Sequence, residues 1–318
     1  MTDALVIGGA GFIGSHLARR LLDREGAAVT VFDNFSSGQD WHLEPVNGHP
    51  RLRVVRGDVN DLDSLTDAAR GHEVAFLLAS NPDIARAATE PAIDFWEGTY
   101  LVQNTLEACR LAGVQRLVYA SGSGVYGDQG ERQLDESFGP LLPVSTYGAS
   151  KLAGEGLISA YCHLFGLRGV AFRFANVVGP RQTHGVVYDF VRKLLRDPTR
   201  LEVLGDGRQS KSYIHVDDVL DAMLMLGGDP PEPFDVFNAA TEDYITVREI
   251  AAIVVDAMGL DGVDVELGKT PGGWKGDVPI VRFSSAKLRA RGWRSRWTSR
   301  EALADSARAI LEEAAVRR

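Results

Sequence analysis

The chain has 318 residues, of which 45% are hydrophobic and 24% are charged, and its net charge is -9. These are the values of a globular protein long enough for more than one minimal domain, and an acidic chain without a basic stripe is not expected to bind nucleic acid. The sequence shows no run near the ~20 apolar residues of a membrane span and no signal-like N-terminus, and its two cysteines lie in helical patterns, so a cytoplasmic protein without a disulfide or metal site is expected.

The first predicted element is a short apolar strand at residues 4–7. A glycine-rich turn, Gly8-Gly-Ala-Gly11-Phe-Ile-Gly14, follows it and leads into a segment from Ser15 to Leu22 with helical apolar spacing. A strand, a glycine turn and a helix in this order are the setting of a dinucleotide-binding fingerprint. Gly8 allows the tight turn, Gly11 lets backbone approach a pyrophosphate at the helix N-terminus, and Gly14 lets helix and strand pack closely.

A second strand, residues 28–32, ends at Asp33, 19 residues after Gly14. That distance is close to the ~20 residues expected of the acid that binds the cofactor ribose. A carboxylate there accepts hydrogen bonds from both ribose hydroxyls and repels a 2′-phosphate. Asn34 follows, and no Arg or Lys lies nearby to receive that phosphate. The sequence therefore favours NAD over NADP.

Strand and helix patterns alternate through the rest of the first half of the chain. The further strands are predicted at 52–55, 74–78, 116–120 and 169–174, and the helices near 62–70, 98–112 and 148–165. This alternation predicts an α/β fold with a doubly wound parallel (Rossmann) sheet, covered by helices on both faces.

Beyond about residue 175 the pattern loosens. Helices are predicted at 186–196, before Gly227, at 247–258 and at 299–315, with a strand at 235–238. We expect an NAD-binding domain at 1–175, which late elements near 210–240 rejoin. Residues 176–318 are expected to form a smaller, partly interleaved substrate lobe, with the ligand in the cleft between the two.

Tyr147-Gly-Ala-Ser-Lys151 places a phenol and an ammonium four residues apart in a segment that reads as helical. Residues at i and i+4 share one helix face. A phenol titrates near ~10 when unperturbed, and a neighbouring cation lowers that value. The pair therefore indicates a base that works near neutral pH, although the motif alone also fits an ordinary amphipathic helix.

The ordered set of motifs resembles the extended short-chain dehydrogenase/reductase family, and within it the NAD-dependent nucleotide-sugar epimerases and dehydratases. The likeness runs over nearly the whole chain. It is carried by residues 8–14, Asp33-Asn34, Gly57-Asp58-Val59, Val118–Ser121, Val125-Tyr-Gly127, Tyr147–Lys151, Arg173–Pro180 and Gly205–Asp218. Residues 183–190 and Trp274-Lys-Gly-Asp277 look most like the UDP-galactose 4-epimerase branch, particularly its archaeal-type members.

The resemblance implies a role for each matching position. Tyr147 would be the acid/base, and Lys151 would hold the nicotinamide ribose and lower the pKa of Tyr147. The implied cofactor residues are Gly8, Gly11, Phe12, Ile13, Gly14, Asp33, Asn34, Asp58, Val59, Leu78, Ala79, Ser80, Tyr147, Lys151 and Phe174. The implied substrate residues are Asn176, Val187, Lys211, Tyr213 and Asp277, although solvated surface or turn capping would also explain Asn176, Lys211 and Asp277. His215-Val-Asp-Asp218 fits a strand-to-helix turn, with Asp217 or Asp218 as N-cap.

Four positions differ from those of all or some family members. The Ser or Thr that usually stands three residues before Val125 is replaced by Gly122. Ser121, Ser123 or a water is the candidate for its hydroxyl. The 4,6-dehydratases carry an Asp-Glu pair where this chain has Ser123-Gly124, so a base for proton removal at C5 is missing. Gly98 stands where relatives commonly have Asn.

The resemblance implies a 4-epimerase of a UDP-hexose that keeps NAD bound. A reductase of 4-keto nucleotide sugars and a non-catalytic NAD-binding regulator remain as alternatives. Family members also dimerise through a four-helix bundle, which the apolar residues of the helices near 98–112 and 148–165 would form here, unless both helices simply cover the sheet. The residues in question are Leu101, Val102, Leu106, Leu157, Ile158 and Tyr161.

Overall fold

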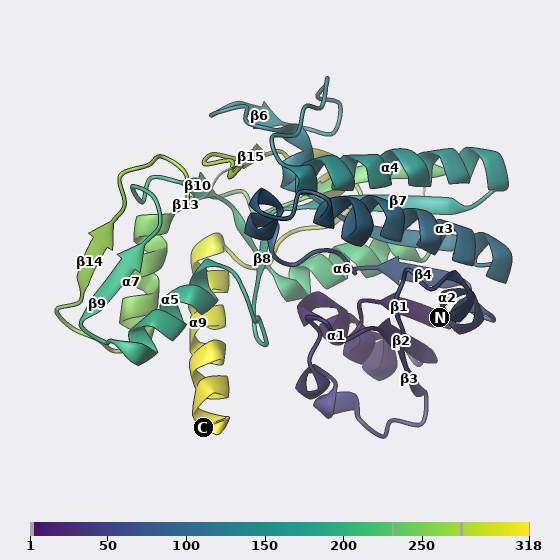
Figure 1. Cartoon of the computed structure of the whole chain (residues 1–318), viewed down its shortest axis with the longest axis horizontal. Helices are drawn as coiled ribbons and strands as arrows, with labels where there is room; N and C mark the ends of the chain where they lie inside the picture. The colour runs from purple at the N-terminus through teal and green to yellow at the C-terminus, as the bar shows by residue number, and fades with distance from the viewer. Residues whose placement is uncertain (1–2, 231, 274–275, 318) are drawn as a thin grey trace. The chain divides into compact units, whose positions relative to one another are not determined.

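The computed structural model describes residues 3–230, 232–273 and 276–317 (Figure 1). The chain divides into two compact units. Unit 1 combines Met1–Val125, Thr146–Arg173 and Leu220–Phe237, and unit 2 combines Tyr126–Ser145, Phe174–Val219 and Asn238–Arg318. The expected roles of the two parts of the chain, cofactor binding and substrate binding, stay predictions.

Unit 1 is built on a seven-stranded parallel sheet with the strand order β12-β7-β5-β4-β1-β2-β3. The strands are β1 (Ala4–Ile7), β2 (Val29–Asp33), β3 (Leu52–Arg56), β4 (Val74–Leu77), β5 (Arg116–Gly122), β7 (Arg168–Phe174) and β12 (Phe234–Ala239). All residues of β1, β2 and β4 are buried, as strands covered on both faces must be. The predicted doubly wound Rossmann fold is confirmed.

The helices of unit 1 begin and end close to the predicted positions. They are α1 (Phe12–Arg20), α2 (Leu62–Ala69), α3 (Leu101–Ala112), α4 (Thr146–Phe165) and most of α6 (Val216–Gly227). A π-helical turn, Phe95–Tyr100, leads directly into α3. In Figure 1, α3 and α4 run side by side, and the hydrogen bond from Gln103 to the Tyr161 hydroxyl (2.7 Å) joins them.

The core of unit 1 contains several residues that were expected on a partner-binding surface. Leu101, Val102, Leu106 and Ile158 are buried in the cluster between the sheet and its helices. Their side chains cover the sheet, which was the alternative explanation of the apolar helices. Any contact with a partner must therefore use other residues of α3 and α4.

Unit 2 contains α5 (Val186–Arg196), α7 (Val247–Ala257), α8 (Ala286–Ala290) and α9 (Ser299–Val316). Four short strand pairs accompany them: β8 (Asn176–Val178) with β11 (Tyr213–His215), β9 (Arg200–Val203) with β14 (Asp264–Leu267), β10 (Ser210–Lys211) with β13 (Ile245–Thr246), and β6 (Gln133–Leu134) with β15 (Arg282–Phe283). Capping boxes at Thr246 and Thr298 start α7 and α9.

The strand-to-helix turn expected at residues 215–218 is present, because β11 ends at His215 and α6 begins at Val216. The predicted N-cap is wrong, since Asp217 and Asp218 both lie inside the first turn of α6. Asp218 instead accepts hydrogen bonds from Ser295 and from the backbone of Arg296. Within the described residues, no helix is long and apolar enough to cross a membrane.

Candidate active site

The glycine turn joins β1 to α1 by a close approach of backbone segments. Gly8 has φ +81°, and a Cβ on it would meet the backbone nitrogen of Ala79 at 2.6 Å. A Cβ on Gly14 would meet the Gly8 carbonyl oxygen at 2.2 Å. Both positions therefore require glycine. The predicted cofactor residues Gly8 and Ala79 are thereby brought together.

The N-terminus of α1 suits a pyrophosphate. Gly11 is the N-cap, no side chain among the described residues caps the helix, and the first turn contains no acidic residue. The unpaired backbone N–H groups of a helix N-terminus attract anions. Phe12 and Ile13, two predicted cofactor residues, open the helix at this end.

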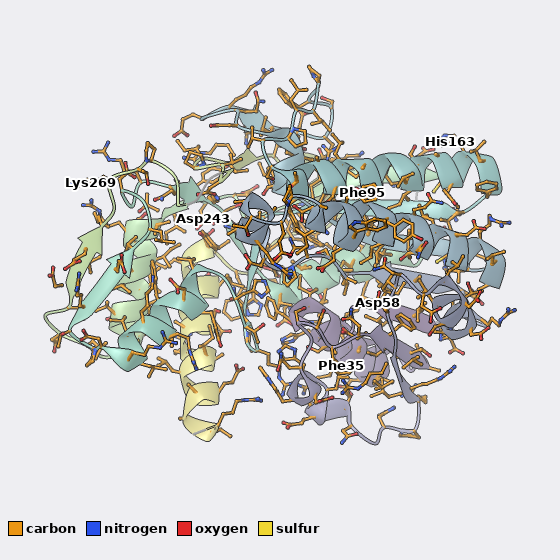
Figure 2. The ribbon with its side chains drawn as sticks, viewed as in Figure 1. Phe35, Asp58, Phe95, His163, Asp243 and Lys269 are labelled. Carbon is orange, nitrogen blue, oxygen red and sulfur yellow. The ribbon has the colours of Figure 1, made fainter. Side chains whose placement is uncertain are left out.

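The ribose-binding acid predicted at Asp33 lies at the end of β2 and is buried. Its carboxylate accepts hydrogen bonds from the backbone N–H of Ala10 (2.9 Å) and of Phe35 (2.8 Å). Burial raises the pKa of Asp33, and the two backbone hydrogen bonds oppose that shift. Asn34 donates to the Asp58 carboxylate (3.2 Å), so the predicted residues at the ends of β2 and β3 form one group. Phe35 and Asp58 are labelled in Figure 2.

The expectation that no Arg or Lys lies near Asp33 is wrong. An arginine does lie near Asp33, because the β2–β3 register places Arg56 beside it. The Arg56 guanidinium lies 3.7 Å from the centre of the Phe35 ring and forms an ion pair with Asp40 (2.6 Å). The preference for NAD therefore depends on the Asp33 carboxylate, with Arg56 engaged by Asp40, rather than on a lack of nearby cations.

The segment after β4 lies against the end of β1. The backbone N–H groups of Leu78 and Ala79 both donate to the Ile7 carbonyl, at 2.9 and 3.1 Å. Ser80, the next residue, is half-buried, and its hydroxyl acts as a donor to the Tyr147 phenol that lowers the pKa of Tyr147. In the segment predicted to contact the adenine, the Val59 carbonyl accepts a hydrogen bond from Asn104 of α3 (3.2 Å).

Tyr147 and Lys151 lie on successive turns of α4, as predicted. Lys151 is buried, and its Nζ donates to the Ala120 carbonyl at the end of β5 (2.8 Å). The same nitrogen lies 5.4 Å from the centre of the Tyr147 ring and 5.2 Å from that of Tyr119. The ammonium thus faces the ring of the proposed acid/base and is tied to the sheet.

The ionisation of this pair differs from the expectation. Burial raises the pKa of Tyr147 to about 12, with the Ser80 hydrogen bond opposing the shift and the nearby Asp94 carboxylate adding to it. Burial lowers the pKa of Lys151 to about 8, and Asp94 opposes that change. The predicted lowering of the Tyr147 pKa by Lys151 is therefore not found, because removal from water is the largest cause of the pKa shift at each group.

In the loop before Val125, which lacks the usual Ser or Thr, the two nearby hydroxyls are those of Ser121 and Ser123. Ser121 donates to Glu155 on α4 (2.6 Å), and Glu155 accepts two hydrogen bonds from Arg173 of β7, at 2.9 and 2.7 Å. Ser121 is thus part of a buried network that holds α4 against the sheet. Ser123 begins a 3₁₀ turn, Ser123–Tyr126, and is half-buried. No heavy atom of the described residues lies within 4 Å of a Cβ built on Gly122.

Four of the five predicted substrate residues form two pairs in unit 2. Lys211 makes an ion pair with Asp277 (2.8 Å), whose carboxylate also accepts from the backbone N–H of Gly273 (3.0 Å). Asn176 lies beside Tyr213 in the β8–β11 register and is hydrogen-bonded to its phenol. Burial raises the pKa of Tyr213 to about 12.

Two predicted residues lie apart from these groups. Val187 is fully buried in the core of unit 2, so its side chain offers no exposed surface to a ligand. Phe174 is buried at the end of β7. Trp274 and Lys275, which contributed to the resemblance, lie outside the described residues.

Sequence reasoning missed two buried carboxylates near α4, Glu155 and Asp94. Glu155 lies one turn after Lys151, a spacing that could have revealed it. Asp94 is buried with 1% of its surface exposed, and carries no motif. It lies 53 residues before Tyr147 in the chain, so only the fold brings it near.

The sequence and the structure of this chain were compared with those of known proteins. Residues 4–240 match the model of the NAD dependent epimerase/dehydratase family. The chain belongs to this family, which confirms the family and the NAD cofactor predicted from sequence. The open N-terminus of α1 and the Asp33 carboxylate fit that cofactor.

Individual relatives cover most of the chain. The UDP-glucose 4-epimerase of Mycolicibacterium smegmatis is 36% identical over 80% of this chain and 82% of its own length. The dTDP-glucose 4,6-dehydratase of Streptomyces griseus is 32% identical over 83% of this chain and 81% of its own length. The crystal structure of Thermus thermophilus UDP-glucose 4-epimerase in complex with NAD has 31% identity and a TM-score of 0.86, over 97% of this chain and 99% of that one. The relatives thus include both nucleotide-sugar epimerases and dehydratases.

Proposed function

We propose that the chain is a 4-epimerase of a UDP-hexose, either UDP-glucose/UDP-galactose or a close UDP-sugar such as UDP-glucuronate. The observation that carries the proposal is the placement of Tyr147 and Lys151 on adjacent turns of α4, tied to the end of β5 by the Lys151–Ala120 hydrogen bond. Ligands of open parallel sheets bind at this end of the strands.

The pKa of about 12 for Tyr147 belongs to the protein without cofactor, and the positive charge of the oxidised nicotinamide ring would lower it. In the proposed reaction, Tyr147 then acts as a phenolate and takes the proton of the sugar 4-hydroxyl. Bound NAD supplies the hydride chemistry at C4. Lys151 holds its charge near the phenol ring and secures the nicotinamide ribose. Tyr147 later returns the proton, once the 4-keto sugar has presented its other face. The reaction involves no net oxidation.

The loop before Val125 supports epimerisation over dehydration. A dehydratase needs a carboxylate that removes the C5 proton, and this chain has Ser123-Gly124 at the positions in question. The two buried carboxylates of unit 1 near α4 have other partners: Glu155 binds Arg173 and Ser121, while Asp94 binds Asn81 and Thr146. This is why we favour the epimerases among the relatives.

The substrate diphosphate is proposed to bind Asn176 and Lys211 of unit 2, with Asp277 near the nucleoside ribose. An ammonium is a suitable partner of a diphosphate. The Lys211–Asp277 pair would then exchange part of its mutual attraction for contacts with the substrate.

We also propose a homodimer that forms through α3, α4 and the π-helical turn before α3. The core residues named above are not available, but several large apolar side chains of these elements are at least 49% exposed: Phe95, Trp96, Leu111, Leu164 and Phe165. Figure 2 labels Phe95 near one end of this surface and His163 near the other. Sedimentation at micromolar concentration tests the proposal, and a monomer would remove it.

The function is tested by incubating the purified protein with UDP-glucose, UDP-glucuronate and UDP-N-acetylglucosamine and following the sugars by proton NMR. We expect inversion at C4 for at least one of them without added NADH. No inversion for any sugar would defeat the proposal. Steady consumption of NADH with a 4-keto nucleotide sugar would instead favour the reductase, and NAD binding without turnover of any sugar would favour the regulator.

A further inference from the structure

Asp94 is a buried carboxylate to which the proposed reaction assigns no role. It immediately precedes the π-helical turn Phe95–Tyr100. One carboxylate oxygen accepts a hydrogen bond from the Asn81 side-chain amide (2.9 Å), and the other accepts from the Thr146 hydroxyl (2.6 Å). Both hydrogen-bond partners are uncharged, and the charge of the carboxylate is felt by Lys151, whose pKa it acts to raise.

The two partners of Asp94 are the chain neighbours of two site residues. Asn81 follows Ser80 in the segment after β4, and Thr146 precedes Tyr147 at the start of α4. Asn81 is further fixed by two hydrogen bonds. Its backbone N–H donates to the Glu97 carbonyl (3.2 Å), and its side-chain oxygen accepts from the backbone N–H of Asp83 (2.9 Å). The Asp94 bridge therefore joins the segment that carries Ser80 to the helix that carries Tyr147.

We propose that Asp94 is a positioning residue whose bridge from Asn81 to Thr146 holds the Ser80 hydroxyl against the Tyr147 oxygen, and that Ser80 is the donor that stabilises the phenolate. This inference rests on the proposed function of Tyr147 as the proton acceptor. In the loop before Val125, Ser121 gives its hydrogen to Glu155 and residue 122 has no side chain. The half-buried Ser123 is the competing donor, and an unchanged Tyr147 pKa in Ser80→Ala would favour it.

The electrostatics of the cluster agree with this division of roles. The Ser80 hydrogen bond lowers the pKa of Tyr147, as a donor to a phenolate does, whereas the Asp94 charge raises it. Asp94 thus acts against the phenolate by charge, and its benefit must come through position. Lys151 and Tyr119 are the other titratable groups that face Tyr147.

Most of the remaining charged groups on the elements packed against α4 are paired with one another. They are Arg86 with Glu90, Glu107 with Arg110, Arg116 with Glu73, and Glu155 with Arg173, while Asp83 is exposed and Glu97 is half-buried. A change in the titration of Tyr147 on alteration of Thr146 therefore reports on the Asp94 bridge, and one on alteration of Ser80 reports on the donor.

The test is a double-mutant cycle read on Tyr147 itself. The NAD-bound protein is labelled with tyrosine carrying ¹³C at Cζ, the Tyr147 signal is assigned from its loss in Tyr147→Phe, and its pKa is measured by NMR titration. Ser80→Ala removes the donor, and Thr146→Val breaks the bridge without changing any charge. Each is expected to raise the Tyr147 pKa by about half to one unit, the worth of one hydrogen bond.

The double variant should show the same pKa as Ser80→Ala, because the bridge acts only through Ser80. Thr146→Ser keeps the hydroxyl and should restore the original value. Thr66→Val is the matched control, since the Thr66 hydroxyl donates only to the Leu62 carbonyl within α2, and it should leave the Tyr147 pKa unchanged. An unchanged pKa in Ser80→Ala, or additive shifts in the double variant, would overturn the inference.

This readout needs no substrate, so it separates the inference from the proposed function. Inversion at C4 without the expected shifts would refute the role of Ser80 and Asp94 alone. The expected shifts without turnover of any nucleotide sugar would uphold the bridge and reject the proposed reaction.

Discussion

The two polar clusters of this protein handle charge in opposite ways. In unit 1, burial moves Tyr147 and Lys151 toward their neutral forms, with pKa values of about 12 and about 8. In unit 2, Lys211 and Asp277 lie in direct contact as an ion pair. A group that transfers protons must be able to change its charge, whereas a group that binds a diphosphate must keep its charge. On this comparison we propose that the first cluster carries the chemistry and that the second binds the substrate.

The clusters also differ in how the chain builds them. Tyr147 and Lys151 share one helix, so their separation follows from the helix repeat. Lys211 and Asp277 are 66 residues apart, and only the fold of unit 2 brings them together. Substitutions in the first cluster should change kcat, and those in the second should change KM.

The largest effect is expected for Tyr147→Phe, which removes the proton acceptor while keeping the ring. We expect kcat for C4 inversion to fall by about 10²- to 10⁴-fold, the usual worth of a general base, with little change in KM. Tyr161→Phe on the same helix is the control, because that phenol bonds Gln103 of α3. Turnover that survives in Tyr147→Phe would contradict the assigned chemistry.

The second prediction concerns the binding cluster. Lys211→Ala should raise KM about 10- to 100-fold, the worth of a charge-assisted hydrogen bond, and leave kcat nearly unchanged. Lys193→Ala is a matched control in the same unit, since Lys193 forms an ion pair with Asp189 along α5. Steady-state kinetics on the sugar identified by NMR measures both. A loss confined to kcat would remove the distinction between the clusters.

The contrast between residues that are close in the chain and residues that only the fold brings together explains which features could be predicted from the sequence. Short, mostly apolar runs of four to six residues that alternate with helical patterns predicted the parallel sheet, because strands buried on both faces are largely apolar. The glycine turn and the Tyr147–Lys151 spacing are local patterns, so they could be read directly. The two-residue strands β10 and β13 of unit 2 are too short for any periodicity, and sequence analysis did not find them.

The charge states of Tyr147 and Lys151 could not be predicted from the sequence, for a different reason. Residue spacing shows that Lys151 can approach Tyr147, but the pKa of each depends on how much water the fold removes and on Asp94, which is distant in sequence. Ser121 shows the same limit. It lies beside the expected hydroxyl position, yet its hydrogen goes to Glu155 on another element.

A smaller effect is expected at Gly122, where a side chain has open space. Gly122→Ser adds a hydroxyl to the loop at little cost in stability and should raise kcat by a few-fold at most, as about one hydrogen bond in the transition state allows. Gly124→Ser is the contrasting variant in the same loop. Its Cβ would lie 3.1 Å from the Gly148 Cα, so it should lower the melting temperature. A kcat lowered by Gly122→Ser would show that the loop needs glycine there.

The smallest effect is a dependence of stability on pH that the first cluster should have. Lys151 has a pKa of about 8 in the folded protein, against 10.5 for a free side chain. Between these values the unfolded chain holds a proton that the folded protein has lost, so the stability contributed at this position rises with pH from about 8 to about 10. Above pH 10 the raised pKa of Tyr147 acts in the opposite direction, which sets the upper limit of the measurement.

Denaturant unfolding of the wild type and of Lys151→Met, measured from pH 7 to pH 10, isolates this contribution, because methionine keeps the length of the side chain and does not titrate. The free energy of unfolding of the wild type should gain on that of the variant as pH rises. Lys193→Met, where the lysine is partly exposed and paired with Asp189, should show no such gain. Parallel curves for the wild type and Lys151→Met would mean that Lys151 keeps its proton in the fold, and the two clusters would then hold charge in the same way.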